Sequence, residues 1–248
     1  MSILNASSAQ GFTLITGATS SIGMELALER CKGENLLLHG RDYQKLMELS
    51  DSLSTRFKIL IWVYDLSKVD SLYEDFRKFV SSQDIVVERV VHAAGQLKIL
   101  PFRAVKLVDT QSIYNVNVFS IIEILRVLTS KEYRRSLQSV VFLSAFFSKF
   151  GDKGNAIYSS SKGALNSLVK GLAVEFPGTR FNSIILGAVR TKMTDHLFVS
   201  GADKSRFDRY ILGTGSPRDV THAISFLLEP SLWMTGQEMF LDGGASIN

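Results

Sequence analysis

The sequence has few of the residues that build cross-linked, fibrous or membrane-spanning proteins. Its 248 residues include one cysteine, Cys31, and only four prolines. A single thiol cannot form a disulfide within the chain, and its apolar helical setting predicts a buried, unreactive group. No apolar run is long enough to span a bilayer, and the first ten residues lack the pattern of a secretory signal. These absences favour a cytoplasmic protein without a membrane partner.

Charge of one sign is not gathered anywhere along the chain. The 28 basic and 24 acidic residues give a net charge of +4 and are interleaved rather than collected in a stripe. A nucleic-acid interface needs a basic patch, so this distribution argues against a nucleic-acid partner. Hydrophobic residues make up 46% of the chain and charged residues 21%, with no low-complexity block, which excludes a disordered or collagen-like protein.

Short apolar segments rich in β-forming residues alternate with segments of helical period. Strands are predicted at 12–16, 36–39, 59–64, 86–92, 140–144 and 181–186. Helices are predicted at 24–31, 43–53, 112–128 and 158–176, and Pro217 opens a later one. This alternation indicates an α/β fold with a doubly wound, Rossmann-like parallel sheet. No linker, repeat or change of composition divides residues 1–248, so a single domain is expected.

A turn of small residues follows the first predicted strand and leads into the first helix. It reads Thr16-Gly17-Ala18-Thr19-Ser20-Ser21-Ile22-Gly23. Small residues let the backbone approach a pyrophosphate, and a helix amino terminus offers free N–H groups and a positive dipole. The same turn could be a plain connection between strand and helix, but its place between the two favours dinucleotide binding.

The end of the second predicted strand bears on the choice of dinucleotide. An NAD site usually carries an acidic residue there, which binds the ribose hydroxyls. This chain has His39-Gly40-Arg41 instead, and a guanidinium suits the 2′-phosphate of NADP. The alternative is a solvated Arg41 that Asp42 partly neutralises. The prediction is NADP(H) in preference to NAD(H).

Residues that transfer protons and polarise carbonyls meet at the same predicted strand ends. Tyr158 and Lys162 are one helical turn apart on one helix face, so the ammonium is expected to lower the tyrosine pKa. Ser144 ends the preceding strand and can reach the same crevice, while Asn117 interrupts an otherwise apolar helix. Taken singly, each has a plainer explanation, such as a surface helix pair or a hydroxyl bonded to the local backbone.

These segments together resemble the single-domain short-chain dehydrogenase/reductase family over nearly the whole chain. The matching motifs are TGATSSIG from Thr16, Asp65-Leu66, HAAG from His92, Asn117, Ser144, YSSSK from Tyr158, NSIILGAVRT from Asn182 and TGQEMFLDGG from Thr235. The resemblance implies an NAD(P)(H)-dependent oxidoreductase that interconverts a carbonyl and a secondary alcohol by hydride transfer. The chain departs from the family pattern at three sites: Ser21 replaces a glycine, His92-Ala93 replaces two asparagines, and Leu186 replaces a proline.

The resemblance also implies roles for individual residues. Tyr158 would be the general acid/base, Ser144 would orient the carbonyl, Lys162 would hold the nicotinamide ribose, and Asn117 would position a water that relays protons. The cofactor would contact Gly17, Thr19, Ser20, Ser21, Ile22, Gly23, Arg41, Asp65, Leu66, Ala94, Gly95, Tyr158, Lys162, Gly187, Val189 and Thr191. The family further implies a homotetramer or homodimer built through the helices that carry Asn117 and Tyr158.

Other residues are assigned with their alternatives. No metal is predicted, because the histidines lack ligand spacing, and His92 is expected to be a hydrogen-bonded core residue. At least one ring of Phe146, Phe147 and Phe150 is expected to line the substrate pocket, and simple core packing is the alternative. Segment 191–215 is expected to be a substrate loop that acts as a lid, or alternatively a helix packed permanently on the core.

Two other function classes compete with the enzyme. A non-catalytic dinucleotide-binding sensor or scaffold would not need the proton-transferring residues. A sugar-nucleotide epimerase or dehydratase generally carries a sizeable C-terminal substrate domain, for which residues 191–215 are too few. The same residues would suit a sugar, an acyl thioester, a steroid or a small ketone as the substrate.

Overall fold

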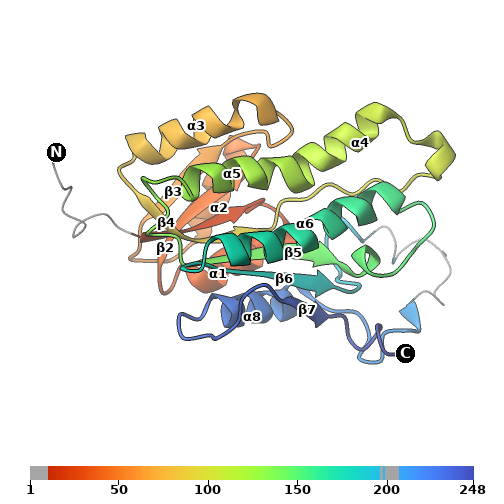
Figure 1. Ribbon diagram of the computed structural model, residues 1–248. Coiled ribbons are helices and arrows are strands. Elements are labelled where there is room, and N and C mark those ends of the chain that lie inside the picture. The colour runs from red at the N-terminus through yellow and green to blue at the C-terminus, as the bar shows by residue number, and fades with distance from the viewer. Residues whose placement is uncertain (1–10, 196–197, 199–206) are drawn as a thin grey trace.

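One parallel sheet organises the computed structural model, which describes residues 11–195, 198 and 207–248 (Figure 1). Its seven strands follow the order β3-β2-β1-β4-β5-β6-β7. They are β1 (Gly11–Thr16), β2 (Asn35–Gly40), β3 (Ile59–Val63), β4 (Val86–His92), β5 (Ser139–Ala145), β6 (Arg180–Leu186) and β7 (Glu238–Leu241). The order runs outward in both directions from β1, so the sheet is doubly wound, as predicted.

Helices cover both faces of the sheet. One face carries α1 (Ser21–Arg30), α2 (Tyr43–Ser52) and α8 (Pro217–Leu228), and the other carries α3 (Val69–Ser82), α5 (Ser120–Leu128) and α6 (Ala156–Glu175). The buried side chains of β2 alternate between the two layers, with Leu36 and Leu38 in one core and Leu37 in the other. Because both faces are buried, such a strand reads as a continuous apolar run in the sequence.

Capping residues set the beginnings of α1 and α8. Helix α1 begins at Ser21, earlier than predicted, because the Ser20 hydroxyl accepts a backbone N–H of the first turn. Helix α8 begins with Pro217, and Ser216 and Asp219 bond to each other's backbone N–H groups. The free thiol of Cys31, at the end of α1, is buried as predicted.

The helix predicted at 112–128 is not one regular α-helix. Helix α4 (Leu107–Tyr114) passes into a π-helical turn at Asn115–Phe119, and α5 continues from Ser120. The π turn contains Asn117, the residue that breaks the apolar pattern. A second difference is β7, a strand that the sequence did not predict, whose residues are mostly half-buried.

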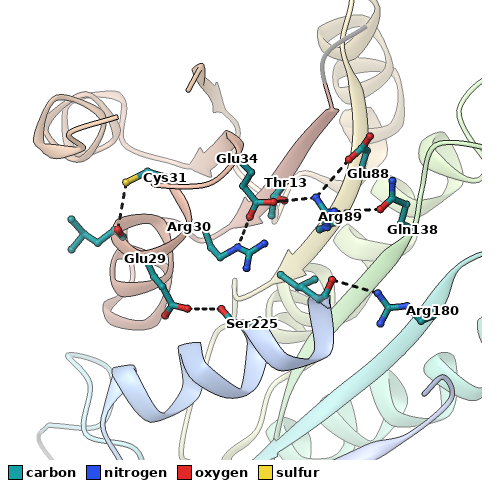
Figure 2. A network of polar contacts seen from close by, with 12 residues as sticks. Thr13, Glu29, Arg30, Cys31, Glu34, Glu88, Arg89, Gln138, Arg180 and Ser225 are labelled. Atoms are coloured by element: carbon teal, nitrogen blue, oxygen red, sulfur yellow. Dashed lines mark hydrogen bonds and ion pairs between the residues drawn. The ribbon is translucent and has the colours of Figure 1, made fainter. Parts of the chain in front are cut away.

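A polar network joins three strands at the amino-terminal end of the sheet (Figure 2). Glu34, just before β2, accepts hydrogen bonds from Thr13 of β1 at 2.8 Å and from Arg89 of β4 at 3.1 Å. Its other carboxylate oxygen pairs with Arg30 of α1. The Glu34 side chain is only 11% exposed, so its removal would leave two guanidinium groups in a poorly hydrated place.

We expect Glu34→Gln to lower the free energy of unfolding by about 1 to 3 kcal/mol, because Arg30 loses its paired carboxylate and Arg89 is left with Glu88, at 3.6 Å, as its carboxylate. Glu74→Gln is the matched control, since it removes an exposed partner of Arg77 and should change stability very little. Urea unfolding at neutral pH measures both variants. Equal losses of stability would contradict the importance of the network.

Candidate active site

A cavity of about 640 Å³ lies at the carboxyl ends of the central strands, where parallel α/β sheets bind ligands. Most of the predicted site residues line it: Thr19, Ser20, Ser21, Ile22, Gly95, Ser144, Tyr158, Lys162, Gly187, Val189 and Thr191. They come from the turn after β1, from the ends of β4, β5 and β6, and from α6. The fold therefore brings residues from five parts of the sequence to one place.

The remaining predicted residues lie outside the cavity wall. They are Gly17, Gly23, Arg41, Asp65, Leu66, Ala94 and Asn117. Gly17 has a φ of +66°, and a Cβ there would lie 2.8 Å from the Cα of Ala94. The ends of β1 and β4 can therefore approach each other this closely only because Gly17 has no side chain. Leu66 is buried in the core, whereas Arg41 is exposed beyond the end of β2.

Ser21, which stands where the family has glycine, joins two parts of the cavity wall. Its hydroxyl accepts the backbone N–H of Lys192 at 3.1 Å. Lys192 belongs to the segment that follows β6, and it lines the same cavity. The hydroxyl thus links the turn after β1 to the beginning of the expected substrate segment.

Hydrogen bonds in both directions connect Lys162 to the end of β5. The ammonium donates to the Leu143 carbonyl at 2.8 Å, and the Ser144 hydroxyl donates to the Lys162 carbonyl at 3.3 Å. The ammonium nitrogen lies 5.8 Å from the centre of the Tyr158 ring. Ser144, Tyr158 and Lys162 therefore share one corner of the cavity, as their spacing predicts.

Burial controls the protonation of the two titratable groups in this corner. It raises the pKa of Tyr158 to about 12 and lowers the pKa of Lys162 to about 8. The expected lowering of the tyrosine pKa is therefore wrong for this structure, because loss of hydration raises the pKa of Tyr158. At pH 7 Tyr158 keeps its proton, and Lys162 is predominantly a cation.

Asn117 is buried behind the cavity wall, where hydrogen bonds occupy its side chain. Its Oδ1 accepts the Gln96 N–H at 2.7 Å, and its Nδ2 donates to the Gln96 carbonyl at 3.1 Å and to the Ser161 hydroxyl at 2.9 Å. The side chain therefore ties the π turn to the segment after β4 and to α6. The main-chain carbonyl of Asn117 faces the ring of His92.

Two buried histidines flank the turn after β1. His39 accepts the Gly17 N–H on Nδ1 at 3.2 Å, and its Nε2 lies 3.1 Å from the Tyr64 carbonyl. His92 lies on the other side of the turn, on β4, and the expectation of a hydrogen-bonded core residue is confirmed. Burial lowers the pKa of His39 to about 4 and, together with the Lys162 charge, that of His92 to about 3. Both rings are neutral at pH 7.

These pKa values predict a loss of stability in acid. The unfolded chain takes up protons on both histidines near pH 6.5, but the folded chain does so only near pH 4 and 3. Stability is therefore complete above about pH 6.5 and falls as the pH drops below it. We expect His39→Gln to reduce the loss between pH 7.5 and 5.5 by about 1 kcal/mol. The exposed His222→Gln is the control, and urea unfolding at each pH gives the values.

Aromatic and aliphatic side chains form the rest of the cavity wall. Phe146 and Phe147 line it, and Phe150 instead stacks on Phe146 with ring centres 4.3 Å apart. The sequence pointed to these three rings and, through the expected substrate segment 191–215, to Phe207, Arg209 and Tyr210, but not to the wall residues Leu97, Ile99 and Asn155. Within the described part of the chain, no cluster of histidine, cysteine, aspartate or glutamate is arranged to hold a metal. None of the described helices is long and apolar enough to cross a membrane.

The chain is similar in sequence to a known protein family. A family model described as enoyl-(acyl carrier protein) reductase matches residues 17–246. An uncharacterised oxidoreductase of Bacillus subtilis is 30% identical, with 93% of this chain and 97% of that protein covered. The chain belongs to the short-chain dehydrogenase/reductase family. It is therefore an oxidoreductase that interconverts a carbonyl and a secondary alcohol, and a non-catalytic sensor is not favoured.

Solved structures agree with this family. A short-chain dehydrogenase/reductase of Brucella melitensis, described as a glucose/ribitol dehydrogenase, superposes with a TM-score of 0.85 at 25% identity, covering 96% of this chain and 97% of that one. Structural neighbours at 23% and 22% identity, which show the fold alone, contain NADP or NADH. A nicotinamide dinucleotide is the cofactor class of this family.

Proposed function

We propose that this short-chain dehydrogenase/reductase uses NADPH to reduce a carbonyl compound with an apolar body. The observation that carries the proposal is the meeting of Ser144, Tyr158 and Lys162 at one corner of a cavity that the first turn of α1 also lines. The backbone N–H groups of that turn lack intrahelical acceptors, so they suit a pyrophosphate. There is space beside the Lys162 ammonium at Gly95. Even a Cβ added to Gly95 would lie 3.5 Å from the ammonium nitrogen, which is an ordinary contact distance.

The residues of this corner suit an acid-assisted reduction. A bound dinucleotide supplies the hydride. Tyr158, whose raised pKa keeps it protonated, would donate its proton to the carbonyl oxygen. The Ser144 hydroxyl would hold the carbonyl by a hydrogen bond, and the Lys162 cation would stabilise negative charge that develops on the oxygen. Asn117 would support this arrangement through Ser161 of α6.

We expect Tyr158→Phe to lower kcat about 10²- to 10⁴-fold, because only the transferable proton is lost while the ring keeps its packing. The affinity for NADPH should stay near that of the parent. The matched control is Tyr73→Phe, a tyrosine of α3 outside the cavity wall. NADPH oxidation with a panel of carbonyl compounds provides the measurement. A Tyr158→Phe variant with parental kcat would remove Tyr158 from the mechanism.

The preference for NADPH rests on the end of β2. Asp42 caps α2 through the Lys45 N–H and pairs with the Lys45 ammonium at 3.2 Å, so its charge is already engaged. Among the described residues, Arg41 has no ion-pair partner within 4 Å, although Asp65 attracts it from further away. An exposed guanidinium at the strand end suits a phosphate group, and Asp65 with Leu66 would flank the adenine.

We expect Arg41→Asp to weaken NADPH binding tenfold or more, since an attraction of about 1.4 kcal/mol or greater becomes a repulsion. NADH binding should change much less. Arg56→Ala, which removes another exposed arginine, is the control. Fluorescence titration with each dinucleotide measures the two affinities, and an unchanged ratio between them would place the phosphate site elsewhere.

The walls of the cavity support an apolar substrate body. Phe146, Phe147, Phe207 and Tyr210 contribute four aromatic rings on the side where a substrate would enter. Gly187 makes the close approach of Tyr210 possible, because a Cβ there would lie 2.8 Å from its ring. Of the expected lid at 191–215, residues 196–197 and 199–206 lie outside the described residues. We propose that the described remainder, which includes Met193 and Phe207, shapes the specificity of the site.

A homo-oligomer completes the proposed function. Apolar side chains are exposed on the π turn and on α6, at Phe119 and Val174, and near the β7 edge, at Trp233 and Phe240. Exposed apolar faces of this kind usually contact a partner. We expect sedimentation velocity at micromolar concentration to show a dimer or tetramer, whereas a strict monomer would contradict the assembly.

A further inference from the structure

The ring of His92 is bonded on both nitrogens and joins three separate elements. Its Nδ1 lies 2.9 Å from the hydroxyl of Thr16, at the end of β1, and its Nε2 lies 3.2 Å from the main-chain carbonyl of Asn117. The side chain has no exposure to solvent. One imidazole therefore spans the space between the phosphate-binding turn and the π turn.

The partners of His92 determine which nitrogen carries its proton. A carbonyl oxygen can only accept, so the Nε2 that faces Asn117 carries the hydrogen. The buried ring is neutral, so Nδ1 has a lone pair and accepts from the Thr16 hydroxyl. That hydroxyl in turn accepts the Ala94 N–H at 3.2 Å, which leaves its own hydrogen directed at the ring. The other tautomer would place a lone pair against the Asn117 carbonyl.

The same hydrogen bonds continue beyond Asn117 to the helix that carries the proton donor. Asn117 donates through Nδ2 to the Ser161 hydroxyl at 2.9 Å, and Ser161 donates to the Tyr158 carbonyl at 2.7 Å. A π turn is a rare and less favourable geometry than an α turn, so it depends on tertiary contacts such as these. His92 supplies the contact to its main chain, and Gln96 supplies contacts to the Asn117 side chain.

We propose that His92 is a positioning residue, whose Nε2–H holds the Asn117 carbonyl and so couples the phosphate-binding turn to the helix of Tyr158 and Lys162. This coupling rests on the proposed function, in which Tyr158 transfers the proton. His92 itself neither touches the cavity nor exchanges protons during the reaction. Its part is to hold the main chain of the π turn at a set distance from β1 and β4.

Nitrogen-15 NMR of the imidazole in the wild-type protein tests the first half of the proposal without any turnover. We expect His92 to be protonated on Nε2 alone and not to titrate between about pH 5 and 9. A ring protonated on Nδ1, or one that titrates in this range, would overturn the proposal. This readout stands even if no carbonyl substrate is found, so failure of the proposed function and failure of the inference are distinguishable.

Two amide substitutions separate the two hydrogen bonds of the ring. The amide of glutamine ends near the position of Nε2 and can still donate to Asn117, whereas the shorter asparagine reaches only the position of Nδ1. We expect His92→Asn to lower kcat about tenfold while KM for NADPH stays unchanged, and His92→Gln to recover most of that loss. Equal kcat values for both variants and wild type, or a loss confined to NADPH binding, would refute the coupling.

A third variant keeps the imidazole in case His92→Asn does not fold. Thr16→Val removes the hydroxyl that donates to Nδ1 but retains the shape of the side chain. We expect NMR to show the ring still protonated on Nε2, because the Asn117 carbonyl still requires a donor, and kcat to fall by a similar factor, because the link from the ring to β1 is lost. Thr16→Ser, which keeps the hydroxyl, is its control. A kcat equal to that of wild type, or a ring protonated on Nδ1, in Thr16→Val would count against the proposal.

Discussion

The candidate site depends on a turn that two uncharged imidazoles hold from opposite sides. His39 reaches it from β2 and His92 from β4, and each ring can accept from the turn only while it remains neutral. Burial enforces that neutrality. Because Gly17 has no side chain, the ends of β1 and β4 approach closely enough for the bond to His92 to form. Loss of hydration disfavours a charged histidine, so it keeps both rings neutral. The neutral rings can then accept the hydrogen bonds that hold the binding turn in its geometry.

Stability and chemistry occupy opposite ends of the same sheet. The Glu34 network joins β1, β2 and β4 at their amino ends, with well-paired charges and no opening to the cavity. At the carboxyl ends, Lys162 is buried and Tyr158 is half-buried at the cavity, and loss of hydration shifts the pKa of both. This separation lets the strands remain rigid while the loops at one edge vary.

The sequence predicted the parts of the molecule that local pattern controls. Strand β4 has the predicted bounds, because its four valines form a β-rich segment even though Glu88 and Arg89 interrupt it. Strand β7 escaped prediction, since its four residues are mostly half-buried and show no such run. The π turn also escaped, because α and π turns share nearly the same apolar spacing. The polar residue Asn117, within an otherwise apolar pattern, was the single indication of the π turn in the sequence.

The grouping of the candidate residues followed from the strand ends, but their electrostatics did not. The spacing of Tyr158 and Lys162 placed both in one corner, yet the direction of the tyrosine pKa depends on burial that no spacing reveals. His39 was noted only as a neighbour of Arg41, because its partners Gly17 and Tyr64 are 22 and 25 positions away in the sequence. Long-range hydrogen bonds of this kind become visible only once the chain is folded.

The buried thiol has a practical consequence for spectroscopy. Cys31 is the only cysteine of the chain, its side chain is enclosed at the end of α1, and burial raises its pKa, so the reactive thiolate is scarce. A cysteine introduced on an exposed residue would therefore react with a maleimide dye while the native one is spared. Fluorophores could be attached singly near the cavity rim, without first replacing Cys31.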